Sequence, residues 1–114
     1  MKFVHKEPKK YAFVDRDGHS GKIFGTDSDK TNHLIIECKK ELNVVLMQQE
    51  SEFNYYILKG SGIFTIDDVN YKVDVGDLVV IPPKHSYTFS GDLKMLLINT
   101  PHYNKEKETV IAKD

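Results

Sequence analysis

The chain has 114 residues, and its 16 Lys and Arg almost balance its 17 Asp and Glu, which leaves a net charge of −1. This balance gives no reason to expect nucleic acid or an anionic membrane surface as a partner. The first residues lack the apolar core of a signal peptide, and no apolar run approaches the ~18 residues that span a bilayer. We therefore expect a cytoplasmic location, and the length predicts one domain over residues 1–114.

The apolar residues alternate with a period of two or form short runs, which is the pattern of strands rather than of helices. These segments are rich in Val, Ile, Tyr, Phe and Thr, as strands prefer. About ten short strands with frequent turn signals indicate an all-β sandwich or small barrel. In chain order the predicted strands are Tyr11–Val14, Gly21–Phe24, Leu34–Lys39, Val44–Gln49, Asn54–Lys59, Gly62–Ile66, Asn70–Val73, Asp77–Ile81, Tyr87–Phe89 and Lys94–Asn99.

Turn residues separate the predicted strands. Asp17 and Gly18 can take the positive φ of a hairpin turn, and Asp67 with Asp68 marks another hairpin. Proline ends a strand because it cannot donate to the ladder of hydrogen bonds. Further breaks are predicted in the polar loop Gly25–Thr31, at Gly60 and Gly62, at Gly76, and at Pro82 and Pro83.

The tail and the single cysteine complete the pattern. The stretch from Asn104 to Lys113 is charged and contains the short apolar run Val110–Ala112. We expect it to form either a short helix or a docked extended arm. Cys38 cannot form an internal disulfide. Because it falls in an apolar-rich strand, we expect a buried, inert thiol.

The stretch from Tyr55 to Pro83 resembles the core of a cupin barrel. It contains the block Tyr-Tyr-Ile-Leu-Lys-Gly, which ends at Gly60, and a second block in which five residues separate Gly76 from Pro82. The resemblance covers about residues 44–100, with N-terminal strands in 1–40 and a C-terminal tail in 101–114. It implies an all-β fold, a cupin-type antiparallel β-barrel that is also described as a jelly roll or double-stranded β-helix.

The resemblance also implies a homodimer, because cupins often associate through sheet edges with N-terminal strands that cross between subunits. Phe3, Val4, Tyr11, Phe13 and Val14 supply apolar side chains for such packing. An unpaired N-terminal strand would favour aggregation, and dimerisation removes that risk.

In metal-binding cupins, two histidines and a glutamate from the first motif and a third histidine from the second motif hold the metal. In this sequence those positions are Met47, Gln49, Phe53 and Tyr87. An offset of one residue would move the first two to Leu46 and Gln48. A thioether, a carboxamide, a phenyl ring and a phenol make no tight site for a transition metal. We therefore expect no metal and no other cofactor; a site built from His33, Glu50, Glu52 or His85 matches no ligand spacing.

A barrel of this size can hold one small ligand. The side chains expected to line it are Met47, Gln49, Phe53, Tyr55, Ile57, Tyr87 and Phe89. Aromatic rings with a few polar groups suit a sugar or a small carboxylate, so the first hypothesis is a small-molecule-binding cupin without a metal. The alternative is that the same side chains fill the barrel as a packed core, which would make the chain a structural or interaction module.

A second hypothesis is a metal-independent cupin enzyme, such as a sugar isomerase or epimerase. Its candidate acid or base is His85, which follows the two prolines near the expected barrel mouth, or Tyr87. A solvent-exposed turn histidine is the other interpretation of His85. We expect His5, His19 and His102 to lie exposed in loops or tails, and His33 to open a strand.

Overall fold

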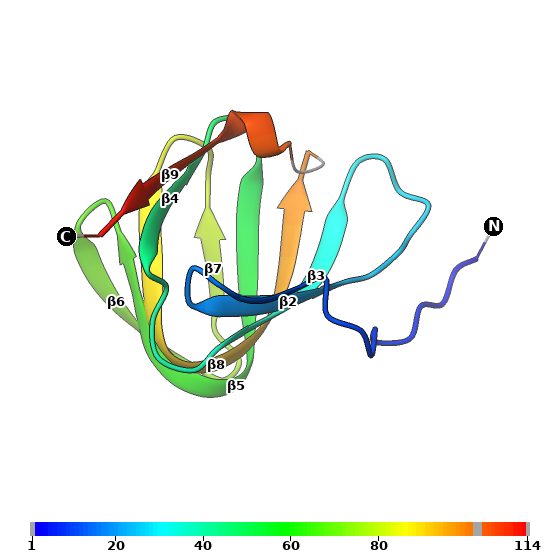
Figure 1. Cartoon of the computed structure of the whole chain (residues 1–114), viewed down its shortest axis with the longest axis horizontal. Helices are drawn as coiled ribbons and strands as arrows, with labels where there is room; N and C mark the ends of the chain where they lie inside the picture. The colour runs from blue at the N-terminus through cyan, green and yellow to red at the C-terminus, as the bar shows by residue number, and fades with distance from the viewer. Residues whose placement is uncertain (1, 102–103, 114) are drawn as a thin grey trace.

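The computed structural model describes residues 2–101 and 104–113, so the expectation for His102 lies outside the described residues. Within these ranges nine strands pair, all antiparallel, into one sheet that curls into a barrel (Figure 1), which confirms the predicted all-β barrel. The elements are β1 (Phe13–Arg16), β2 (His19–Ile23), β3 (Asn32–Cys38), β4 (Val44–Gln48), β5 (Glu52–Ile66), β6 (Val69–Asp74), β7 (Leu78–Ile81), β8 (Ser86–Thr100), the short 3-10 helix η1 (Lys105–Lys107) and β9 (Glu108–Ala112).

Two long strands, β5 and β8, form the middle of the sheet. They pair with each other along their whole length, from Glu52 opposite Thr100 to Ile66 opposite Tyr87. The sequence predicts each of them as two separate strands. That prediction is wrong, because both strands bend while they stay paired with each other. A bulge at Leu58, between Ile57 and Lys59, absorbs the change of direction in β5.

Glycine makes this bend possible because the two backbones almost touch there. A Cβ atom placed on Gly60 would lie 1.7 Å from the carbonyl oxygen of Asp92, and one on Gly91 would lie 2.4 Å from that of Ser61. Both glycines also have positive φ, at 87° and 118°, which other residues rarely adopt. The position thus requires glycine for space and for backbone conformation.

The bend divides the sheet into two walls. In the first wall, the first half of β5 and the second half of β8 lie between β7 and β3, with β2 and β1 beyond β3. In the second wall, the other halves of β5 and β8 lie between β6 and β4, with β9 beyond β4. Figure 1 shows the walls joined below by the curve of β5 and β8, with η1 at the opposite end.

Aromatic side chains from both walls meet in the space between them. Neighbouring rings of Phe53, Tyr55, Phe64, Tyr87 and Phe89 have centroids between 5.1 and 6.5 Å apart, and each of these pairs is tilted or edge-on. These contacts stabilise the barrel by about 0.5–1.5 kcal/mol each beyond the burial of apolar area. Both walls supply rings, so the aromatic cluster holds them together.

The tail and Cys38 can be compared with their predicted states. The tail contains both forms that the sequence left open, since η1 is followed by β9, which pairs with β4. Cys38 is buried and its thiol pKa is raised by that burial, as an inert thiol requires. No helix within residues 2–101 and 104–113 is long and apolar enough to cross a membrane.

The close approach at the bend predicts a large cost for a methyl group at Gly60. We expect Gly60→Ala to lower the free energy of unfolding by about 3 kcal/mol, because β5 and Asp92 must separate to admit the Cβ atom. Urea denaturation measures this change. Gly76→Ala is the matched control, since Gly76 has φ of 94° but open space around it, and backbone strain alone costs about 1 kcal/mol. Equal losses in the two variants would contradict the steric account.

Candidate functional site

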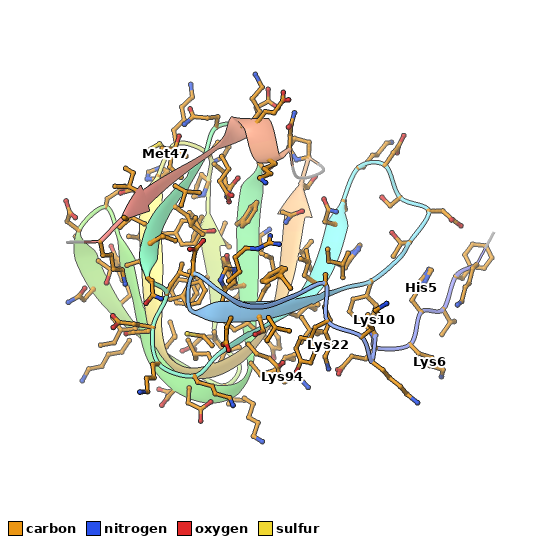
Figure 2. All side chains as sticks on the ribbon, viewed as in Figure 1. His5, Lys6, Lys10, Lys22, Met47 and Lys94 are labelled. Carbon is orange, nitrogen blue, oxygen red and sulfur yellow. The ribbon has the colours of Figure 1, made fainter. Side chains whose placement is uncertain are left out.

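The residues of β4 that face the interior are offset by one position from those that the sequence predicted. Leu46 and Gln48 are buried, whereas Met47, labelled in Figure 2, and Gln49 are half-buried on the alternate positions. The amide of Gln49 donates to the hydroxyl of Thr109 on the exposed surface. The expectation that Met47 and Gln49 line the interior is therefore corrected to Leu46 and Gln48, because a shift of one residue reverses the faces of a strand.

The other expected lining residues are buried between the walls: Phe53, Tyr55, Ile57, Tyr87 and Phe89. Among them, the hydroxyls of Tyr55 and Tyr87 are hydrogen-bonded at 2.9 Å. On the neighbouring strand, Gln48 Nε2 donates to Glu108 Oε2 at 2.5 Å. The interior of this aromatic barrel therefore contains polar groups from β4, β5, β8 and β9.

Burial raises the pKa of both phenols, so Tyr55 and Tyr87 stay protonated at neutral pH. Among the smaller effects, a bond from Gln48 lowers the pKa of Tyr87, while the bond between the phenols raises the pKa of Tyr87 and lowers that of Tyr55. The bond between the two hydroxyls uses the proton of only one phenol, whichever of them donates. The hydroxyl proton of the other phenol therefore stays available to a ligand.

His19 also faces this interior. Its ring centroid lies 5.0 Å from that of Phe13 and 6.3 Å from that of Phe89. Nδ1 donates to the carbonyl oxygen of Arg16 at 2.5 Å, and burial lowers the pKa of the imidazole. Because a carbonyl only accepts, the neutral ring carries its proton on Nδ1 and has Nε2 as an acceptor. The expectation of an exposed His19 is wrong, because the turn at Asp17 and Gly18 is short and β2 begins at His19.

Glu108 provides the negative charge of this region. Its charge raises the pKa of His19, Tyr55 and Tyr87, in each case as a smaller effect than burial. We call the set of His19, Gln48, Tyr55, Tyr87 and Glu108 the interior polar cluster. No sequence pattern indicated a buried role for Glu108, because a glutamate within a charged tail has the pattern of a solvated surface residue.

The metal positions of a cupin do not fit a metal in this chain. In the corrected register they are Leu46, Gln48, Phe53 and Tyr87, and the phenol of Tyr87 stays protonated. Transition metals in proteins prefer imidazole, thiolate and carboxylate ligands. Within the described ranges, no three His, Cys, Asp or Glu residues form a group that could hold a metal ion. No chemical step is therefore assigned to a metal.

His85 and Tyr87 do not share a site. His85 is exposed on the outside of the barrel, where Nδ1 lies 2.5 Å from Asp67 Oδ2. It borders an outer groove between β6 and β7, lined by exposed apolar residues such as Tyr71 and Leu78. Tyr87 is buried inside, so the exposed turn histidine is the better interpretation of His85.

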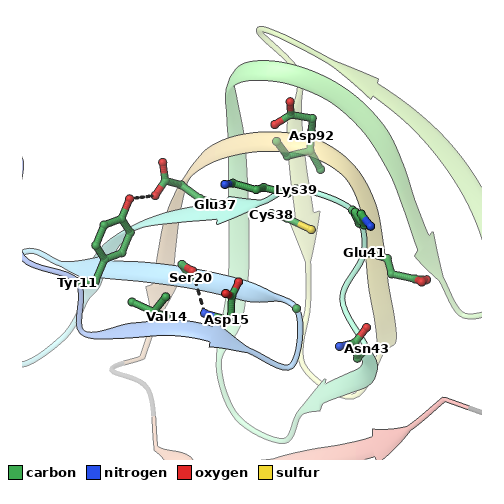
Figure 3. A pocket seen from close by; sticks show the side chains of 13 residues that line it. Tyr11, Val14, Asp15, Ser20, Glu37, Cys38, Lys39, Glu41, Asn43 and Asp92 are labelled. Atoms are coloured by element: carbon green, nitrogen blue, oxygen red, sulfur yellow. Dashed lines mark hydrogen bonds between the residues drawn. The ribbon is translucent and has the colours of Figure 1, made fainter.

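A further pocket of about 700 Å³ lies between the β1–β2 hairpin, the end of β3 and the bend at Asp92 (Figure 3). It is lined by the carboxylates of Asp15, Glu37, Glu41 and Asp92 and by the side chains of Lys39 and Lys40. The hydroxyl of Tyr11 donates to Glu37 at its rim. None of the predicted site residues lines this pocket, so it is separate from the interior polar cluster.

The lowered pKa of His19 predicts a pH effect on stability. Between that lower pKa and the ordinary value of 6.5, the unfolded chain binds more protons at this residue than the folded chain. The free energy of unfolding should therefore fall as pH falls below about 6.5 toward the lower pKa of the folded state. Well above pH 6.5 His19 is deprotonated in both states, so it should add no pH dependence there.

The variant that checks this effect is His19→Asn, whose amide can still donate to Arg16 but cannot titrate. Urea denaturation between about pH 5 and pH 7.5 should show a weaker pH dependence for His19→Asn than for the wild type. The control is His5→Asn, a change at a half-buried histidine of the N-terminal arm, which the sequence had predicted to be exposed. Parallel pH profiles for the wild type and His19→Asn would contradict the burial of a neutral imidazole.

Comparisons with known proteins agree with this architecture. No family model matches the chain. An uncharacterized protein of Methanocaldococcus jannaschii is 38% identical over 65 residues, which cover 54% of this chain and 52% of that protein. The match thus spans about half the length of that relative.

Solved structures are similar over more of the chain. A variant of Streptomyces PAC13 with uridine has a TM-score of 0.90 at 18% identity, covering 98% of this chain and 92% of that one. Another structure of Pac13, which is described there as a unique nucleoside dehydratase, has the same TM-score at 17% identity; the likeness covers 98% of this chain and 92% of that one. An RmlC-like cupin from Shewanella frigidimarina has a TM-score of 0.67 at 15% identity, with 85% and 86% covered. At these identities the likeness shows the fold alone, and the chain has the cupin fold that its motifs resemble.

Proposed function

We propose that this chain is a small-molecule-binding cupin that takes a sugar-bearing ligand between its walls without the help of a metal. The observation that carries the proposal is the hydrogen-bonded series from Glu108 through Gln48 and Tyr87 to Tyr55, set among aromatic rings. Sugars are bound by acceptors and donors for their hydroxyls and by rings against their C–H faces. The uridine in the Streptomyces PAC13 structure is a sugar-bearing molecule of the same kind.

The charge of the interior favours a sugar over a small carboxylate. Glu108 is half-buried beside the tyrosine pair, and its charge already disfavours further negative charge on Tyr55 and Tyr87. A bound carboxylate would meet the same repulsion at low effective dielectric. A hydroxyl group, in contrast, can donate to the Glu108 carboxylate and accept from Tyr55.

A metal-independent enzyme is the second candidate, with His19 in place of His85 as the base. The observation that favours it is the neutral imidazole, held through Nδ1 by Arg16 with Nε2 as the free acceptor. Such a base could take a proton from a carbon next to a carbonyl group and return it to that carbon or its neighbour, as an isomerase or epimerase requires. One of the similar structures is described as a nucleoside dehydratase, which supports a barrel of this shape as the scaffold of an enzyme.

Binding is tested by isothermal titration of the untagged protein with free sugars, nucleosides including uridine, and small carboxylates. We expect a sugar-bearing ligand to bind, and Tyr55→Phe or Glu108→Gln to weaken it by about tenfold, since each removes one hydrogen bond to the ligand. His85→Asn is the control and should bind as the wild type does. Tighter binding of carboxylates than of sugars would contradict the proposal, and a protein that binds none of them would support a packed structural module.

The same titration samples distinguish a binding protein from an enzyme. In D₂O, exchange of a carbon-bound hydrogen of the ligand, followed by proton NMR, would support the enzyme. His19→Asn should then abolish the exchange but leave binding within about twofold. Binding without exchange in the wild type would leave the binding protein as the function.

We also propose a homodimer, for which the N-terminal arm gives the reason. Residues 2–12 form no strand, and Glu7 and Tyr11 of this arm contact the barrel through Lys22, Lys94 and Glu37. Phe3 and Val4, nearer the N-terminus, are 83% and 68% exposed. A second copy could cover these side chains. A cytoplasmic location stays a prediction from the sequence.

Light scattering tests the dimer. The wild type should have about twice the chain mass of 13.1 kDa, and a Phe3→Ser/Val4→Ser variant should shift toward the monomer. Val110→Ser, a change at an exposed position of β9, is the control. A monomeric wild type at micromolar concentration would contradict the proposal.

A further inference from the structure

Four buried polar atoms have no hydrogen-bond partner in the part of the chain that the structure describes: His33 Nδ1, Asn54 Oδ1, Thr88 Oγ1 and Asn99 Oδ1. The first three belong to half-buried residues that alternate with the inward-facing positions of their strands. Asn99 differs, because it is only 2% exposed and continues the buried row of β8 that contains Met95 and Leu97. Asn99 is therefore the orphaned side chain that faces the barrel interior.

The surroundings of Asn99 connect it to the interior polar cluster. Asn99 stands directly opposite Phe53 of β5 in the sheet register. The ring of Phe53 in turn lies 6.3 Å from that of Tyr55 and 6.5 Å from that of Tyr87, measured between centroids. One aromatic side chain thus separates the carboxamide of Asn99 from the paired phenols.

A buried carbonyl oxygen without a partner lowers the stability of a fold, so its presence calls for a compensating role. An apolar residue in the row of Met95 and Leu97 would avoid this cost. A ligand that donates a hydrogen bond to Oδ1 would satisfy the group and would gain specificity, because an analogue without the donor leaves the oxygen unpaired.

We infer that Asn99 is a specificity-determining residue of the proposed site, and that its Oδ1 accepts a hydrogen bond from the ring N–H of a pyrimidine nucleoside. This inference rests on the proposed function. A planar heterocycle fits an aromatic side chain, Phe53, beside a neutral acceptor, Asn99. The sugar of the same ligand would meet Glu108 and Tyr55, whose carboxylate and hydroxyl suit vicinal hydroxyl groups.

The test compares uridine with uridine methylated on its imide nitrogen, which keeps the ring but lacks the N–H. We expect the wild type to bind uridine about tenfold more tightly than the methylated compound. Asn99→Leu, which keeps the branched shape but has no acceptor, should bind both compounds equally. It should also raise Tm by about 4 °C, because it removes an unsatisfied buried group.

The matched control is Thr88→Val. It removes another orphaned atom, the hydroxyl of an outward-alternating residue on the same strand, and should keep the preference for uridine unchanged. The comparison between the two ligands on the wild type does not depend on whether either variant folds.

The outcomes separate this inference from the proposed function. Equal binding of uridine and its methylated form by the wild type, or a lower Tm in Asn99→Leu, would overturn the role of Asn99 and leave the proposed function standing. Binding of other sugars but not of uridine would do the same. If the wild type bound no sugar or nucleoside at all, the proposed function would fail and the inference would fail with it.

Discussion

The close contact between β5 and β8 at their common bend is the constraint on which the rest of this structure depends. Gly60 and Gly91 let two backbones approach where any side chain would collide with a carbonyl group. The bend turns one continuous sheet into two walls, and the strands on either side then face each other. Without it the aromatic rings of β5 and β8 would lie along a flat sheet, and no interior would exist.

The interior combines two tasks that usually conflict. Its aromatic rings stabilise the barrel, whereas the tyrosine pair, Gln48 and Glu108 place polar groups and a charge between the walls. Polar groups in a core lower stability unless they are bonded, and most of these are bonded to one another. Asn99 Oδ1 is not, and we infer that a ligand supplies its missing partner. The interior has a carboxylate, neutral phenols and a neutral imidazole, which suit hydroxyl groups.

The sequence was sufficient for the fold because its strongest signals are local. Short alternating runs, glycine at the bend and the pair Gly76 and Pro82 predicted an antiparallel barrel of the cupin kind. The continuity of β5 and β8 was missed because a glycine-rich bend has the same pattern as a turn. The inward face of β4 was missed by one residue, since its period of two does not say which set of residues, Met47 or Gln48, faces the core. His19 and Glu108 could not be found because they reach the interior from a hairpin and from the tail, through contacts distant in sequence.

We propose that a small sugar-bearing molecule binds between the walls of the barrel. The most direct measurement is a crystal structure of the protein soaked with uridine. We expect density for the ligand between Phe53 and Glu108, with the Tyr55 hydroxyl in hydrogen-bond contact with the sugar. Ligand density confined to the pocket at the β1–β2 hairpin or to the β6–β7 groove, with the interior closed by its own side chains, would contradict it.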